Sequence, residues 1–137
     1  MAIVGVNFSK ISVEKKDMLK GKINITNNIA IKDVKEKDLA PGKELNQKGL
    51  QFFFEFASKY EPKAGEIKIS GEVLFVGSKK ATEDIIKGWK KNKNIPKEAM
   101  TAVLNTALTK CNIQALILSQ QVNLPPPIPM PKLGAKK

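Results

Sequence analysis

This sequence has no histidine and a single cysteine, Cys111. The lack of histidine excludes the usual metal sites and histidine-based acid–base catalysis. One cysteine cannot form an internal disulfide, so a cytoplasmic location is the default expectation. No Gly-rich turn has the spacing of a Walker A or dinucleotide-binding loop. We therefore predict that the protein is not an enzyme and has no catalytic residue, no metal site and no cofactor. Cys111 is predicted to be a buried, inert thiol.

Arginine is also missing: all 24 basic residues are lysine, against 13 acidic residues, for a net charge of +11. Arginine is the side chain that reads guanine and clamps phosphates in a fixed fork, whereas a lysine surface attracts polyanions non-specifically. The excess is concentrated in residues 79–97, which allows two interpretations, a solvated surface or a polyanion site. The lysines of that segment are Lys79, Lys80, Lys87, Lys90, Lys91, Lys93 and Lys97.

No apolar run approaches the length that spans a bilayer, so we expect no membrane insertion. The hydrophobic fraction of 42% and the clear periodicities argue against disorder. The length suits one domain with a real core. We predict a single α+β domain over residues 1–123, followed by a proline-rich strap and basic tail over 124–137.

Apolar residues alternate with polar ones in four segments, which predicts strands at about 3–14, 22–32, 50–60 and 66–77. The apolar parity of the first segment switches, so we expect a bulge near Ser9-Lys10. Asn27-Asn28 is a candidate kink in the second. The charged stretch Asp33 to Lys48 is expected to be a long connection, and Pro62 to Glu66 a hairpin turn. Four successive strands followed by helices predict an antiparallel sheet in an α+β fold.

Aromatic residues are only 6% of the chain, yet they cluster in the third predicted strand. Most of them share one parity there, so they lie on one face. That face is either a buried core or an apolar groove for a client, because aromatic rings offer large contact area at little entropic cost. The predicted client-binding residues are Phe52, Phe54, Phe56, Tyr60 and Phe75.

Two helices are predicted, at about 79–91 and 96–121. Ser78 or Thr82 is expected to cap the first, with Glu83 and Asp84 in its first turn. Its Trp89 is either packed on the sheet or a stacking platform for RNA bases.

The second predicted helix is entered by Pro96 and followed by a proline run. Ile113, Leu116 and Ile117 lie off its apolar seam and make its C-terminal half apolar nearly all round, so we expect a second subunit, in a homodimer or homotetramer. The seam residues, predicted for helix packing and subunit contact, are Leu104, Leu108, Cys111, Ala115 and Leu118.

The proline run after that helix is expected to be extended. It is either a ligand for a proline-binding domain or a strap that packs along its own protein. The second interpretation is the better one, because apolar residues recur along the run. They are Leu124, Ile128, Met130 and Leu133.

From about Asn94 the order is a helix-entry proline, a long helix with a cysteine on its seam, then Val122-Asn123-Leu124-Pro125 and a proline-containing strap. This order resembles the SecB-type export chaperones, in which four antiparallel strands precede a long helix and an Asn-Leu-Xaa-Pro-like connection. The four-strands-then-helix plan spans nearly the whole chain, and the motif covers about residues 95–129. Because bacterial members are acidic and this chain is basic, the resemblance is to a divergent or archaeal-type member rather than to the bacterial export factor itself.

The resemblance implies a pleated sheet packed on helices, in dimers often paired into tetramers, that holds unfolded polypeptides in an apolar groove without nucleotide. The leading hypothesis is therefore a cytoplasmic holdase chaperone whose partners are unfolded polypeptide clients. The alternative is a basic RNA- or ribosome-associated protein that binds nucleic acid non-specifically. A third possibility is a structural subunit whose apolar surface is all used in assembly.

Overall fold

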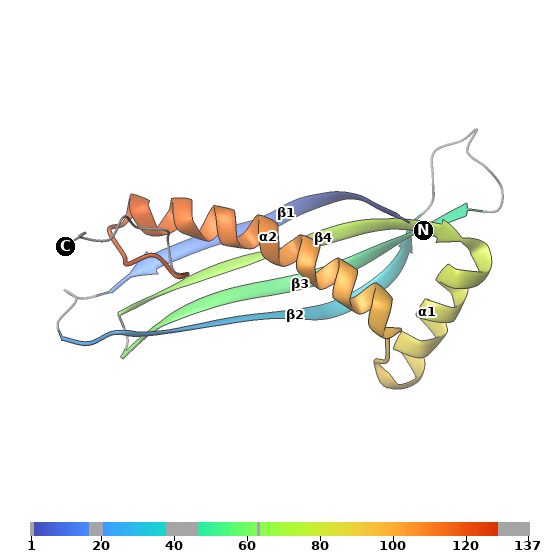
Figure 1. The fold of residues 1–137 in the computed structure, drawn as a ribbon, viewed down its shortest axis with the longest axis horizontal. Helices are drawn as coiled ribbons and strands as arrows, with labels where there is room; N and C mark the ends of the chain where they lie inside the picture. Colours follow the sequence, from blue (N-terminus) through green and yellow to red (C-terminus); the bar gives the residue numbers. More distant parts are fainter. Residues whose placement is uncertain (1, 17–20, 38–46, 63, 129–137) are drawn as a thin grey trace, which may run out of the picture.

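The computed structural model describes residues 2–16, 21–37, 47–62 and 64–128. Four long strands form one antiparallel sheet in the order β1-β4-β3-β2, and two helices follow them (Figure 1). The strands are β1 Ala2–Lys15, β2 Asn24–Lys37, β3 Gln47–Glu61 and β4 Gly65–Ser78; the helices are α1 Lys79–Asn92 and α2 Lys97–Gln121. The predicted α+β fold class is confirmed.

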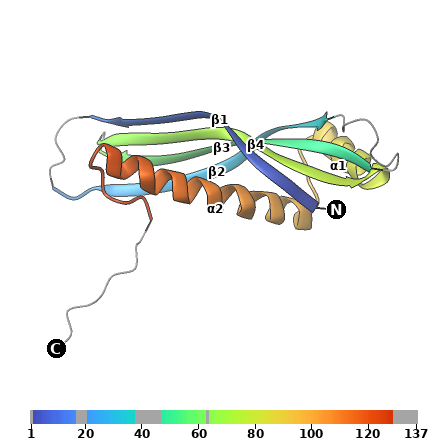
Figure 2. The ribbon, with the colours of Figure 1, turned by 90° about the horizontal axis from the view of Figure 1, so that it is seen from above.

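The molecule has two layers, because α2 lies on one face of the sheet and no other described element covers the opposite face (Figure 2). The 25 residues of α2 make it about 37 Å long. The helix crosses the sheet diagonally, from the β2 edge at its start towards the β1 edge at its end (Figure 1). It therefore diverges from β2 along its length and leaves one corner of the apolar face to be covered by something else.

The strap covers that corner. Leu124 is buried, and its amide N–H donates to the carbonyl of Ser119 at 2.8 Å. Asn123 before it is in the left-handed conformation (φ 59°), so the chain turns back after the helix. The Tyr60 hydroxyl donates to the carbonyl of Pro125 at 2.5 Å. Burial raises the pKa of Tyr60 to about 12, so the phenol remains a donor at neutral pH. The predicted packing of the strap on its own sheet is confirmed for residues 124–128, and Met130, Leu133 and the tail lie outside the described residues.

A polar chain beneath the strap explains why asparagine occurs on an apolar face. The Ser58 hydroxyl donates to Oδ1 of Asn27 at 2.6 Å, and Nδ2 of Asn27 donates to the carbonyl of Pro127 at 2.8 Å. The kink expected at Asn27-Asn28 is absent, because the pairing of β2 with β3 continues through both residues without a register shift. Asn27 is thus a strap contact within a regular strand.

Bulges occur on both edge strands. The pairing of β1 with β4 shifts between Phe8 and Lys10, which confirms the predicted bulge, and a second, unpredicted shift lies between Ile3 and Gly5. The pairing of β2 with β3 shifts between Ile31 and Asp33. An added residue returns the next apolar side chain to the core face.

That last bulge makes β2 longer than predicted. After the shift, Val34 is buried, and pairing with β3 continues to Lys37. The predicted long connection from Asp33 to Lys48 is therefore wrong at both ends, because β2 ends at Lys37 and β3 begins at Gln47. The remaining residues, 38–46, lie outside the described residues. The predicted hairpin between β3 and β4 is confirmed, but its turn is shorter than Pro62 to Glu66, since β3 ends at Glu61 and β4 begins at Gly65.

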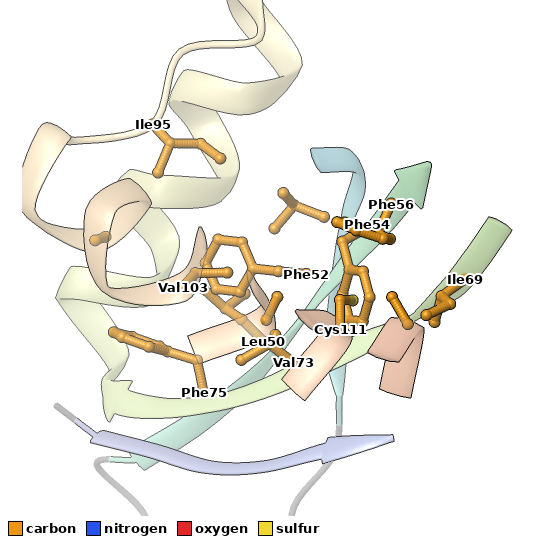
Figure 3. Close-up of a cluster of buried hydrophobic side chains, with 14 of the residues drawn as sticks. Leu50, Phe52, Phe54, Phe56, Ile69, Val73, Phe75, Ile95, Val103 and Cys111 are labelled. Atoms are coloured by element: carbon orange, nitrogen blue, oxygen red, sulfur yellow. The ribbon is translucent and has the colours of Figure 1, made fainter. Parts of the chain in front are cut away.

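The core combines large residues on the sheet with small ones on the helix. Phe52, Phe54 and Phe56 are at most 2% exposed and project from β3 under α2 (Figure 3). The buried stripe of α2 repeats mostly every four residues and is largely small: Ala99, Val103, Ala107, Cys111, Ala115 and Leu118. Small helix residues allow close approach to bulky rings, so the two layers can interdigitate.

Gly71 provides space for two aromatic rings. It pairs with Phe54 on one side and Phe8 on the other, and those rings meet edge to face with centroids 6.5 Å apart. A Cβ on Gly71 would lie 2.2 Å from the carbonyl oxygen of Asn7 and 3.0 Å from Cζ of Phe54. Only glycine fits this position without movement of the backbone.

Helix α1 is capped by Ser78, whose Oγ accepts from the amide of Ala81 at 3.2 Å. Thr82 is not the cap: it is buried within the helix, and its hydroxyl donates to the carbonyls of Ser78 and Lys79. Glu83 and Asp84 were expected in the first turn, but the helix begins at Lys79 and its first turn has no acidic residue. The two carboxylates consequently lie too far along the helix to face its unpaired amides.

Candidate functional site

An apolar groove lies between edge strand β2 and the flank of α2. β2 pairs with β3 on one side and with no other described strand, so the backbone N–H and C=O groups of its other side make no ladder hydrogen bonds within the described residues. Two recesses follow one another along β2 and α2, and together we call them the β2–α2 groove. The first, of about 490 Å³, is lined by Ala30, Ile31, Lys32, Trp89, Lys93, Met100 and Leu104. The second, of about 350 Å³, is lined by Asn27, Asn28, Ile29, Leu108, Asn112 and Ile128.

Trp89 forms the end wall of the first recess and is held from two sides. Trp89 is 8% exposed, and its Nε1 donates to Oδ1 of Asp33 at 3.3 Å. The same oxygen accepts the amide of Val34 at 2.8 Å, so the bulge of β2 positions the carboxylate for the indole. Nζ of Lys93 lies 4.8 Å from the centroid of the Trp89 ring, a cation–π contact. The recess thus has a rigid aromatic wall with an ammonium group at its mouth.

The second recess is bounded by the strap, since Ile128 is one of its walls. Because Asn27 binds the strap carbonyl at Pro127, the same residue both anchors the strap and lines the recess. The depth of this part of the groove therefore depends on the strap remaining on the sheet.

The five predicted client-binding residues are all in the core. Phe52, Phe54, Phe56, Tyr60 and Phe75 are between 0% and 4% exposed. The four phenylalanines lie in the buried cluster shown in Figure 3. They share one face of the sheet, as their parity indicates, and that face is the buried one. A client can contact these rings only if α2 or the strap leaves the sheet.

The predicted seam of α2 divides into two groups. Cys111, Ala115 and Leu118 are buried against the sheet, and burial raises the pKa of the Cys111 thiol to about 12, so the expected buried thiol is confirmed. Leu104 and Leu108 are half-buried and line the β2–α2 groove. The stripe that meets the sheet instead continues through Val103 and Ala107.

The C-terminal half of α2 is apolar on its outer side, as predicted. Ile113 and Ile117 are 57% and 44% exposed, and they are among the most exposed large apolar residues in the described part of the chain. Val4 and Ile11 on β1 are the others.

The seven lysines of the predicted polyanion site are all exposed. Five of them belong to α1, and at 100° per residue they fall within about one third of its circumference, on the side away from the sheet. Glu83 and Asp84 lie among them. Trp89 is on the buried side of α1, so it packs on the sheet and does not offer a face to a base.

Sequence reasoning missed the residues of the groove, apart from the two leucines that it placed on the seam. The signal was present in Met100, Leu104 and Leu108, which step by four along one flank of the helix. It was not decisive, because a neighbouring stripe of smaller residues has the same period.

The described residues include no cluster of carboxylates and thiols arranged to hold a metal ion. None of the described helices combines the length and apolarity that a bilayer crossing requires.

The described residues form an α+β scaffold with an edge strand beside an apolar recess. No protein-family model, no curated protein and no solved structure matches this chain.

Proposed function

We propose that this protein is a SecB-like holdase, a cytoplasmic chaperone that binds extended apolar segments of unfolded polypeptides without nucleotide or catalysis. The observation that carries the proposal is the β2–α2 groove, which places a free strand edge beside an apolar flank of a helix. An unfolded client offers both backbone hydrogen bonds and apolar side chains, and this groove has a complement for each.

The groove is suited to a chain in extended conformation. A client strand added to β2 would lie about 4.8 Å outside it and direct alternate side chains towards α2. The two recesses are centred about eight residues apart on α2, or about 12 Å. In an extended chain, residues i and i+4 are about 13 Å apart on the same face. Apolar residues at those two positions therefore fit the two recesses together, and buried apolar area contributes about 25 cal/mol per Å².

An aggregation assay tests the proposal. A chemically unfolded client diluted into buffer at moderate salt should precipitate more slowly with an equimolar amount of the protein. Leu104→Gln places an amide in the first recess and should abolish most of this effect. Ile11→Gln is the matched control, because Ile11 is 43% exposed on the opposite edge strand. If the wild-type protein does not delay precipitation, or if both variants lose the effect equally, the proposal is wrong.

The assembly we propose is a homodimer or homotetramer formed through the outer side of α2. Ile113 and Ile117 expose apolar surface there, and neither packs on the sheet of its own chain. Burial of these side chains against a second copy would stabilise the association by removing them from water. The groove lies on a flank of the same helix, so an assembly through the outer side leaves it open.

The second candidate function is non-specific RNA binding, favoured by the lysines gathered on one side of α1. Glu83 and Asp84 reduce the net charge of that side, and Trp89 is not available for stacking. Filter binding with single-stranded RNA separates the two functions. Submicromolar affinity that falls steeply with added salt, together with no effect on client precipitation, would favour RNA binding.

A further inference from the structure

The charge at the mouth of the β2–α2 groove has one sign. Of the residues that line the two recesses, only Lys32 and Lys93 are charged, and both are lysine. They line the first recess from different elements, Lys32 from β2 and Lys93 from the C-cap of α1. Both are exposed.

The neighbouring carboxylates only partly offset this charge. Asp33 accepts from the Trp89 indole and the Val34 amide and lies 4.0 Å from Nζ of Lys35. Glu55 lies 3.8 Å from Nζ of Lys32, in a pair with both side chains about half exposed. Such exposed pairs are weak and exchange readily with other partners.

Lys93 occupies a backbone position that lysine does not favour. It is the C-cap of α1 in the left-handed conformation (φ 59°, ψ 31°), where glycine or asparagine is the usual residue. This conformation directs its ammonium group over the Trp89 ring at the mouth of the recess. A non-glycine residue in this conformation beside a pocket is consistent with a role for its side chain.

We propose that the β2–α2 groove selects extended segments whose apolar residues at i and i+4 are flanked by aspartate or glutamate. The inference rests on the proposed holdase function and names its substrate class. A second copy of this chain is a poor occupant in the register that places Lys32 opposite Lys32, because like charges directly opposite on paired strands are destabilising. The net charge of +11 also draws acidic segments towards the protein before contact.

Three fluorescein-labelled peptides with one alternating apolar core test this selectivity by anisotropy. Their flanks carry glutamate, serine or lysine. At low salt we expect the glutamate-flanked peptide to bind about five- to tenfold more tightly than the lysine-flanked one, since two exposed charge pairs each contribute modestly. The ratio should shrink towards one as added salt screens the lysines.

The double variant Lys32→Glu/Lys93→Glu should reverse the order of the peptides, and Lys32→Gln/Lys93→Gln should abolish the preference. The matched control is Lys10→Glu/Lys68→Glu, which makes the same change in net charge on exposed lysines of β1 and β4 that do not line the groove. It should leave the preference intact. Circular dichroism confirms that each variant is folded.

The outcomes separate the two proposals. If the three peptides bind equally and Leu104→Gln weakens all of them, the holdase function stands and the acidic selectivity is wrong. If the control variant reverses the order as strongly as the groove variant, the selectivity comes from net charge and its assignment to the groove is wrong. If no peptide binds, both proposals fail.

Discussion

The polar chain from Ser58 through Asn27 to the strap permits a test of what holds the strap on the sheet. Asn27→Ala removes the donor to the carbonyl of Pro127 and the acceptor of the Ser58 hydroxyl. Ser58 is 0% exposed, so its hydroxyl would be left buried without a partner. A lost hydrogen bond costs about 1 kcal/mol and an orphaned buried hydroxyl about 1–2 kcal/mol more. We expect Asn27→Ala to lower the free energy of unfolding by about 2–3 kcal/mol.

A double-mutant cycle with Ser58→Ala separates the lost hydrogen bond from the orphaned hydroxyl. Ser58→Ala leaves only Oδ1 of Asn27 unpaired, and because Asn27 is exposed, water can replace the lost donor. We expect a loss of about 1 kcal/mol. The double variant has no orphaned hydroxyl, so it should be about 1–2 kcal/mol more stable than Asn27→Ala alone, with a coupling of about 2–3 kcal/mol between the two positions.

Guanidinium unfolding at one fixed protein concentration measures the free energy of unfolding of all four proteins. The emission of Trp89 is the signal, since the chain has a single tryptophan. Asn28→Ala is the matched control, because the Asn28 side chain makes no hydrogen bond within the described part of the chain, and it should change stability by less than about 0.5 kcal/mol. Additive single losses would refute the reasoning, because they would mean that Ser58 and Asn27 do not stabilise the strap as one network.

Three further predictions follow from the packing. Gly71→Ala should destabilise the protein by more than about 3 kcal/mol in the same unfolding experiment, while Gly5→Ala, where a Cβ meets nothing within 4 Å, should have little effect; similar losses would contradict the packing described. Burial holds the pKa of Cys111 at about 12 against 9.0 for a free thiol, so above pH 9 the unfolded state loses its proton first and folding stability falls. Between pH 9.5 and 11 the free energy of unfolding of the wild type should therefore fall by about 1.4 kcal/mol per pH unit more than that of Cys111→Ala. Parallel plots of this free energy against pH would contradict the prediction. Light scattering should give at least a dimer for wild type and a lower mass for Ile113→Lys/Ile117→Lys, whereas a monomeric wild type at micromolar concentration would overturn the proposed assembly.

The local patterns in the sequence determined the elements and their order. Alternation over residues 66–77, the parity switch at Ser9-Lys10, the entry at Pro96 and the stop at Val122-Asn123 each depend on neighbouring residues alone. They predicted the four strands, one bulge, both helices and the return of the strap. The order of the strands within the sheet did not follow from these patterns, because pairing joins residues that are far apart in the chain.

The tertiary structure decided which surfaces are open. The sheet carries the bulky rings of Phe52 and Phe54, so the helix meets it with its smallest stripe, through Ala99 and Ala107. This rotation turns the larger residues of the neighbouring stripe, including Leu104, towards the β2 edge. Periodicity in the sequence indicates that a helix has apolar stripes, but the volumes of the side chains on the facing sheet determine which stripe is buried. The aromatic residues were therefore identifiable from sequence as one face, whereas their burial and the groove beside them were not.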